Sequence, residues 1–224
     1  MDTAVCNRFI PWLLIGLTLL TFGRVVNDGF APYDDELTIR DNPRMNPARF
    51  TSEGVLWYWN NPAMSLYAPL TYTVWGAIAT GSRVHGADPT EFILDAGNFH
   101  VASLLLHVAS VLLVFIILRR LLKRPWPAAA GALLYALHPL QVETVAWASG
   151  LKDLLASALS LATIWFYLRA VTPASPALEA MDSDEAPSSR IDFASYALAI
   201  VCFVLALLAK SSAMMTPVLI ALRS

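Results

Sequence analysis

The chain alternates between long apolar stretches and polar segments. A helix needs roughly 20 mostly apolar residues to cross the hydrocarbon core of a bilayer. Five stretches qualify, and they cover residues 9–26, 97–118, 127–148, 151–170 and 193–210. A sixth apolar stretch covers residues 212–224 and is expected to be part of a further span. The pattern therefore predicts an all-α fold, a polytopic integral membrane helical bundle.

Two polar segments separate these stretches. Residues 27–96 form a long mixed loop, and residues 171–192 form a linker rich in Ser, Pro and acidic residues. Within the long loop, residues 66–78 are apolar, but Pro69 interrupts them and they are too short to span. We expect an amphipathic helix that lies in the membrane interface. Six aromatic residues are expected to anchor this region at the interface: Trp57, Tyr58, Trp59, Tyr67, Tyr72 and Trp75.

Composition supports the membrane assignment. Charged residues make up 14% of the 224 residues and hydrophobic ones 57%, whereas a soluble domain averages about 25% charged residues. The net charge of −2 says nothing about nucleic acid, and no Lys/Arg stripe with interleaved aromatics suggests it, so we expect no nucleic-acid partner. Cys6 and Cys202 offer neither a disulfide framework nor a metal-ligand spacing. No small-residue cleavage pattern follows the first stretch, so we interpret it as an uncleaved anchor.

Basic residues predict the orientation of the chain. Arg119, Arg120, Lys123 and Arg124 crowd one short loop, and such loops face the cytoplasm. Alternation from there places the N-terminus and the 171–192 linker inside and the 27–96 loop outside. Seven ionisable residues from separate junctions then fall on the exterior side: Asp34, Asp35, His138, Glu143, Lys152, Asp153 and Lys210. Four of them, Asp34, Glu143, Lys152 and Lys210, are expected to line a common cleft.

Three groups of polar residues lie at the ends of apolar stretches. Pro139 breaks a helix between His138 and Glu143, and ionisable groups at such a break are functional candidates. The alternative is a cap in which His138 and Glu143 bond each other or the freed backbone groups. Lys152 and Asp153 are equally consistent with a snorkelling lysine beside an acidic helix start. Lys210 follows the fifth stretch on the outside, where an anionic headgroup, most simply a phosphate, would explain it.

Two histidines share one face of the second stretch. His100, Ser103 and His107 follow the i, i+3, i+7 spacing of a helix. Two histidines could bind a metal, but no third or fourth ligand stands at a matched spacing. We expect His107 to hydrogen-bond a neighbouring helix, and His100 to face the outer cavity.

A series of short motifs follows one order along nearly the whole chain: Tyr33-Asp34-Asp35, Asp41-Asn42-Pro43, Tyr67-Ala68-Pro69-Leu70-Thr71, His100 and His107, His138-Pro139-Leu140-Gln141-Val142-Glu143, Lys152-Asp153-Leu154-Leu155, Ala209-Lys210 and Thr216-Pro217. In these motifs the sequence resembles the bacterial relatives of the transmembrane-and-tetratricopeptide O-mannosyltransferases, which belong to the GT-C class of polytopic glycosyltransferases. The His-Pro-to-Glu and Lys-Asp blocks are fairly specific together, whereas each alone would be weak.

The resemblance implies transfer of a sugar, with mannose as one candidate, from a polyprenyl-phosphate donor to an acceptor hydroxyl. The acceptor would be a protein or glycan at the exterior face of the cell membrane. Asp34 and Asp35 would act as the general base or hold a divalent metal, a cofactor that the sequence leaves open. Lys210 and Lys152 would bind the donor phosphate. His138, Glu143, Asp153 and His100 would support the site, which is surrounded by membrane lipids.

The sequence also departs from this family. Members carry Arg or His where Ala68 stands, often Arg where Leu151 stands, and commonly Asn where Ser103 stands. The helical-repeat domain usual in the family does not follow in these 224 residues. An alternative is therefore a catalytically silent, truncated membrane protein that binds a lipid-linked phosphate or a partner protein. A small transporter is a further alternative, for which no inverted repeat is visible.

Overall fold

The computed structural model describes residues 3–45, 51–63, 66–86, 92–171 and 192–221. The predicted linker at 171–192 therefore falls almost wholly outside the described residues. The last three residues of the sixth apolar stretch do so as well.

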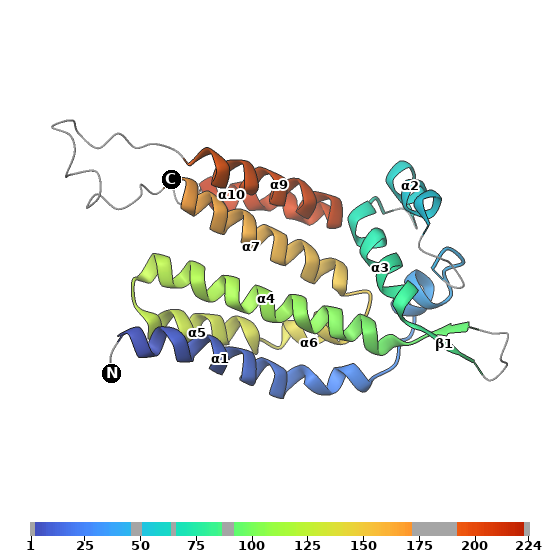
Figure 1. Ribbon diagram of the computed structural model, residues 1–224, viewed down its shortest axis with the longest axis horizontal. Helices are drawn as coiled ribbons and strands as arrows, with labels where there is room; N and C mark the ends of the chain where they lie inside the picture. Colours follow the sequence, from blue (N-terminus) through green and yellow to red (C-terminus); the bar gives the residue numbers. More distant parts are fainter. Residues whose placement is uncertain (1–2, 46–50, 64–65, 87–91, 172–191, 222–224) are drawn as a thin grey trace.

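The core of the protein is a bundle of roughly parallel and antiparallel helices (Figure 1). Its members are α1 (Thr3–Phe22), α4 (Ala96–Leu122), α5 (Pro125–Ala136), α7 (Leu151–Val171), α9 (Phe193–Ala209) and α10 (Thr216–Ala221). Three segments are long and apolar enough to cross a membrane: Arg8–Asn27, Ala96–Leu122 and Leu151–Val171. The first of them includes a 3₁₀ turn, η1 (Gly23–Asn27), that extends α1. The prediction of an all-α membrane helical bundle is confirmed.

The expected span at 127–148 is two helices. α5 ends at Ala136, and α6 (Leu140–Ala146) starts after Pro139. Pro139 has no N–H to continue the ladder, so the helix breaks here as its position predicts. The expected stretch at 193–210 is α9, which has 17 residues, and the chain then turns through η3 (Ser211–Met215) into the short α10.

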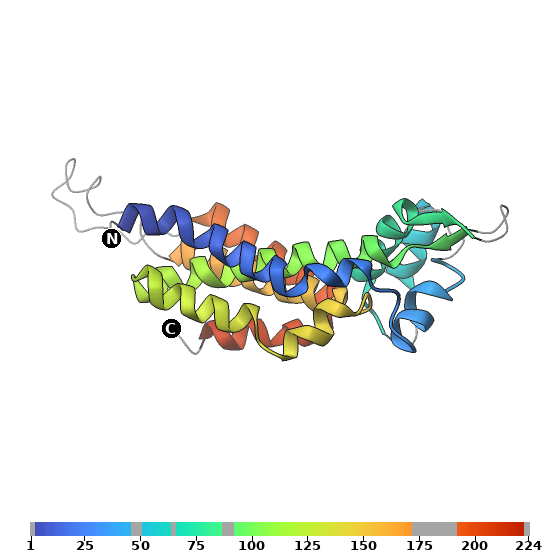
Figure 2. The ribbon, with the colours of Figure 1, turned by 90° about the horizontal axis from the view of Figure 1, so that it is seen from below.

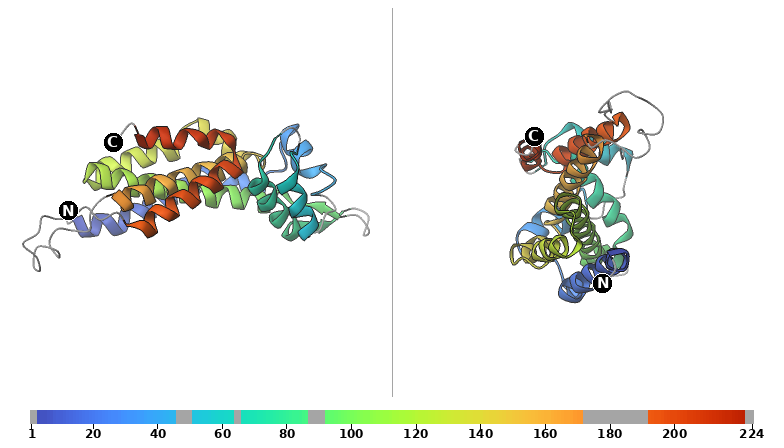
Figure 3. Two further views of the ribbon diagram at one scale, coloured as in Figure 1. Left: turned by 90° about the horizontal axis from the view of Figure 1, so that it is seen from above. Right: turned by 90° about the vertical axis from the view of Figure 1, so that its left-hand side faces the viewer.

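The described residues of the long loop after α1 fold into a small unit at one end of the bundle, which we call the cap (28–45, 51–63, 66–86 and 92–95). The cap contains a short π-helical turn, η2 (Glu36–Arg40), and the helices α2 (Ser52–Asn60) and α3 (Pro69–Gly81). The hairpin of β1 (Arg83–His85) and β2 (Phe92–Leu94) follows, with Arg83 opposite Leu94. Figures 2 and 3 show from below and from above that the cap occupies one end only.

Aromatic side chains join α2 to α3. Pro69 starts α3 rather than interrupting it, as Pro favours the first helical turn. Tyr58 and Tyr72 are buried and stack with ring centroids 4.6 Å apart, and Trp75 packs edge-on against Tyr72. Burial raises the pKa of Tyr58 to about 12. The expectation that these three rings anchor the membrane interface is wrong, because they form the core of the cap.

Small residues let the bundle helices approach closely. Alanines 128, 132 and 136 of α5 are fully buried against Val111 and Phe115 of α4 and against α1. Alanine at a helix interface removes the bulk that would hold two backbones apart. α4 also contacts α7, and α7 contacts α9, so that α4 and α7 form the middle of the bundle.

Candidate functional site at the cap end of the bundle

Asp35 fastens the cap to the bundle. Its side chain is fully buried. Oδ2 accepts hydrogen bonds from the backbone N–H of Ala31 at 2.8 Å and of Ala148 at 3.0 Å, and Oδ1 accepts one from Ser149 at 2.8 Å. Ala148 and Ser149 lie just before α7. The Asp35 carboxylate therefore joins the first loop to the start of a central helix.

Asp34 has a different environment from its neighbour. Tyr33 adopts a left-handed backbone, with φ of 71°, and the chain turns so that Asp34 is exposed while Asp35 points inward. Within the parts of the chain that the structure describes, the Asp34 carboxylate makes no hydrogen bond or ion pair. The Asp34 carboxylate is therefore open to solvent, whereas the oxygens of Asp35 already accept hydrogen bonds from the backbone.

Asp153 and Lys210 form an ion pair beside the cap. Asp153 Oδ1 contacts Lys210 Nζ, and both side chains are about one-third exposed, at 37% and 31%. The pair joins the first turn of α7 to the residue after α9. Thr71 of α3 donates a hydrogen bond of 2.9 Å to the carbonyl of Ala209. Lys210 thus lies at the same end of the bundle as Asp35 and the cap.

A cavity lined by hydroxyl groups lies next to this ion pair. Its volume is about 380 Å³, and its polar lining includes Tyr135, Gln141, Thr144, Asp153, Ser157, Ser160, Ser212 and Thr216. The hydroxyls of Tyr135 and Ser157 lie 3.3 Å apart, and Thr216 donates to Ser160 at 3.0 Å. Sequence analysis missed these residues, although Asp153, Ser157 and Ser160 share one helical face at i, i+4 and i+7.

His138 and Glu143 flank the helix break and are exposed. The backbone N–H of Leu140 donates to His138 Nδ1 at 3.2 Å. His138 therefore binds a backbone group freed by the helix break, as the capping alternative expected. Among the described residues, no hydrogen bond or ion pair joins His138 to Glu143, and none joins either residue to Asp153 or Lys210. Lys152 is half-buried beside Asp153.

Both histidines of α4 are fully buried against backbone carbonyls. His107 Nε2 lies 3.0 Å from the carbonyl oxygen of Ala136, which the end of α5 leaves without a helical partner. The expected interhelical hydrogen bond of His107 is therefore present. His100 Nε2 lies 3.2 Å from the carbonyl of Gly29, so His100 holds the first loop rather than facing an open cavity.

The described residues contain no group of three or more His, Cys, Asp or Glu side chains that could hold a metal ion. The carboxylates have different partners, since Asp35 accepts hydrogen bonds from backbone N–H groups and Asp153 pairs with Lys210. These described residues alone do not fit a divalent metal site.

Two positions where the resembling family carries a basic residue belong to the apolar core of this chain. Ala68 is 2% exposed and Leu151 is 0% exposed. They pack in one cluster with Trp75 and Phe99, beneath the cap. A cation at either position would be buried among apolar side chains, at a large desolvation cost. Lys210, paired with Asp153 of the cavity lining, is a cation that does lie at this end of the bundle.

The comparisons with known proteins give one partial match to a curated protein. No family model matches the sequence, and no solved structure matches it. The chain is 33% identical over 107 residues to the Protein O-mannosyl-transferase Tmtc2 of Drosophila melanogaster, a match that covers 42% of this chain. The chain spans about a tenth of that relative, with 11% of it covered. This likeness supports a distant relation to the transmembrane-and-tetratricopeptide O-mannosyltransferases and a membrane location.

Proposed function

We propose that the chain is a glycosyltransferase-like membrane protein of the GT-C class. It would transfer a sugar from a polyprenyl-phosphate donor to a hydroxyl of a protein or glycan. The observation that carries this proposal is the placement of exposed Asp34 at the same end of the bundle as the Asp153–Lys210 pair and its hydroxyl-lined cavity. The likeness to a protein named as an O-mannosyltransferase supports the same reading.

Asp34 would act as the general base. Its carboxylate takes the proton of the acceptor hydroxyl while the hydroxyl oxygen attacks the anomeric carbon of the sugar. The bond from that carbon to the lipid phosphate breaks, and its electron pair leaves with the phosphate. Attack from the face opposite the leaving group inverts the anomeric centre. Asp35 is a positioning residue in this scheme, since its oxygens are used by the backbone.

Lys210 would stabilise the departing phosphate. An ammonium group has three N–H donors, and the contact with Asp153 uses one of them. The other two can reach phosphate oxygens, and a charge-assisted hydrogen bond strengthens as negative charge develops there. Lys152, one residue before Asp153, would supply further positive charge. The hydroxyls of the neighbouring cavity are suited to bind sugar hydroxyls.

The orientation is part of this proposal. The four basic residues at 119–124 lie at the end of the bundle remote from the cap, and by the positive-inside tendency they face the cytoplasm (Figure 1). The N-terminus would then be cytoplasmic, and the cap with Asp34 and Lys210 would face the exterior, where the acceptor is found.

The test is transfer of radiolabelled mannose from a polyprenyl-phosphate donor in membranes that contain the 224-residue chain. Asp34→Asn should lower the rate by about 10²–10⁴-fold, the usual loss on removing a general base. Asp28→Asn is the matched control, because Asp28 is another exposed acid of the same loop. Unchanged transfer by Asp34→Asn, or an equal loss in Asp28→Asn, would contradict the role of Asp34.

A second candidate function is a catalytically silent protein that binds a lipid-linked phosphate. The burial of Ala68 and Leu151 favours it, because two basic side chains of the resembling family are replaced here by core residues. This candidate predicts that the unaltered chain binds the donor without transferring the sugar. Lys210→Ala would weaken that binding in either case, so the transfer rate of the unaltered chain separates the two functions.

A further inference from the structure

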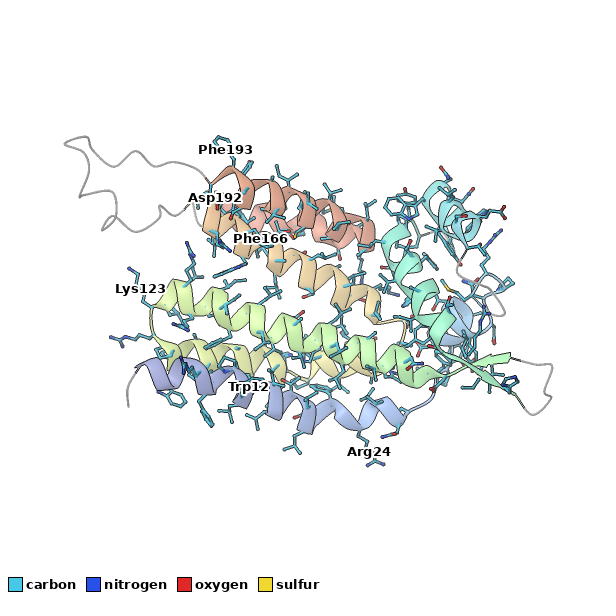
Figure 4. All side chains as sticks on the ribbon, in the orientation of Figure 1. Trp12, Arg24, Lys123, Phe166, Asp192 and Phe193 are labelled. Carbon is cyan, nitrogen blue, oxygen red and sulfur yellow. The ribbon has the colours of Figure 1, made fainter. Side chains whose placement is uncertain are left out.

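A second polar cavity lies at the end of the bundle opposite the cap. Its volume is about 480 Å³, and α4 and α7 line it through Ile116, Arg119, Arg120, Lys123 and Trp165. α4 ends at Leu122, and α7 ends at Val171. Figure 4 shows Lys123 where α4 ends, far from the cap. The cavity therefore lies where two candidate membrane-spanning helices end, away from Asp34 and Lys210.

Arg120 is held in a defined position inside this cavity. One terminal nitrogen donates a hydrogen bond of 3.1 Å to the carbonyl of Leu168. The guanidinium carbon lies 5.6 Å from the centroid of the Trp165 ring, in range of a cation–π interaction. A guanidinium carries five N–H donors, so the contact with Leu168 leaves four for a ligand. Both contacts come from α7 and fix a side chain of α4.

The positive charge of this cavity is not balanced within the described part of the chain. The ion pairs found there are Arg40 with Glu36, Arg40 with Asp41, and Lys210 with Asp153. Arg119, Arg120 and Lys123 take part in none of them. Lys123 has a left-handed backbone, with φ of 56°, and its N–H caps α4 by donating to the carbonyl of Arg119. Three cations therefore converge where an anion would complete the site.

We propose that this cavity binds the phosphate of an anionic phospholipid headgroup. Arg120 would present two parallel N–H groups to the phosphate, and Arg119 and Lys123 would add charge from the end of α4. Ile116 and Trp165 give the cavity an apolar wall, against which the glycerol and the first acyl carbons pack. A soluble phosphate would leave that wall unused. Basic pockets between membrane helices bind such headgroups, and the positive-inside tendency assigns this one to the cytoplasmic leaflet.

The experiment measures lipid binding to the purified full chain in a neutral detergent. Phosphatidylglycerol and phosphatidylcholine with the same acyl chains are added separately, and bound lipid is counted by native mass spectrometry. We expect one phosphatidylglycerol to bind in preference to phosphatidylcholine. Arg120→Gln should raise the dissociation constant for phosphatidylglycerol about fivefold, and Arg119→Gln with Lys123→Gln about thirtyfold, from about one basic residue's attraction each.

Arg169→Gln is the matched control, because Arg169 is an exposed basic residue in the last turn of α7 and does not line the cavity. It should leave the dissociation constant unchanged. If Arg120→Gln does not fold, as judged by its helical circular dichroism, the Arg119 and Lys123 double variant decides the question. This site is separate from the proposed transfer site, so Asp34→Asn should bind phosphatidylglycerol normally whether or not the chain transfers sugar.

Four results would overturn the proposal. Equal binding of the two lipids would show that charge plays no part, and an equal loss in Arg169→Gln would show a diffuse surface attraction. Inorganic phosphate that binds as tightly as phosphatidylglycerol would point to a soluble ligand. A lipid preference that appears only after Asp182, Asp184 and Glu185 are neutralised would assign the cavity to the chain's own acidic segment.

Discussion

Replacing Asp35 by Asn tests whether a buried carboxylate fastens the cap to α7. The two oxygens of Asp35 accept three backbone hydrogen bonds, from Ala31, Ala148 and Ser149. An Asn side chain has the same shape but one acceptor oxygen and one NH₂ group. If the amide oxygen keeps the two bonds made by Oδ2, the NH₂ group faces the N–H of Ser149. That buried donor then loses its partner.

The structure sets the size of the effect. A buried N–H group without a partner costs about 1–3 kcal/mol. Because 1.4 kcal/mol corresponds to a factor of ten, hydrogen exchange of the amides around Ser149 should speed up about 5- to 150-fold. Asp35→Ala would strip all three donors of their acceptor, at about 3–9 kcal/mol. That cost approaches the whole stability of an ordinary domain, about 5–15 kcal/mol, so the Ala variant should accumulate poorly.

The assay is hydrogen exchange followed by mass spectrometry on the purified chain in detergent. Peptides that cover residues 145–150 should lose protection in Asp35→Asn, whereas peptides from the middle of α4 should not. Asp34→Asn is the control, because the Asp34 carboxylate is exposed and accepts no hydrogen bond from the described residues. Its substitution therefore leaves none of their donors without a partner. Equal protection in Asp35→Asn and the unaltered chain, or equal losses in both variants, would refute the fastening role.

Two further substitutions test local packing and capping. A Cβ on Gly150 would lie 2.4 Å from the carbonyl oxygen of Thr144, so Gly150→Ala must shift backbone and should cost about 1–3 kcal/mol of stability. Gly16→Ala, where nothing lies within 4 Å, is its control, and thermal unfolding in detergent measures both. Asp192 caps α9 and accepts a hydrogen bond from the Ser195 hydroxyl. This hydrogen bond is the main cause that lowers the pKa of the Asp192 carboxyl below the ordinary 3.8. Because the pKa of Asp192 is lower in the folded chain than in the unfolded chain, its capping contact stabilises the fold above about pH 3.8. This contribution should fade as the pH drops below that value. Asp192→Ala should abolish that fading in a pH series of melting temperatures, and an unaltered pH dependence would contradict it.

The sequence predicted the bundle because hydropathy reports directly which helices need an apolar environment. It overestimated the stretch at 127–148, since averaging over a window hides the missing N–H of Pro139. The burial of Tyr72 and Trp75 was missed for a different reason. The same aromatic residue types occur at membrane interfaces and in packed cores. Only the contact between the cap helices and the bundle shows that these side chains are packed.

The sequence drew attention to the adjacent acids Asp34 and Asp35 but not to their different environments, and it missed the hydroxyl residues that line the cavity. Nothing in the adjacent pair Asp34 and Asp35 shows which one turns inward. That outcome depends on the backbone N–H groups of Ala148 and Ser149, which lie 113 and 114 residues away along the chain. The junction argument did place Lys210 correctly at the cap end, because each apolar helix returns the chain to one end or the other.

Asp35 holds Ala148 and Ser149 just before α7, and Asp153 lies in the first turn of that helix, so the two sets of contacts are connected through the start of α7. Ser149, which Asp35 holds, precedes Asp153 by four residues and lies just before α7 begins at Leu151. Asp153 in turn holds Lys210. A loosened Asp35 would therefore displace Lys210, which lies at the same end of the bundle. Asp34 has no such connection in the described structure, so its loss should leave phosphate binding intact. An acid that affects donor binding is then a positioning residue, and an acid that affects transfer alone is the base.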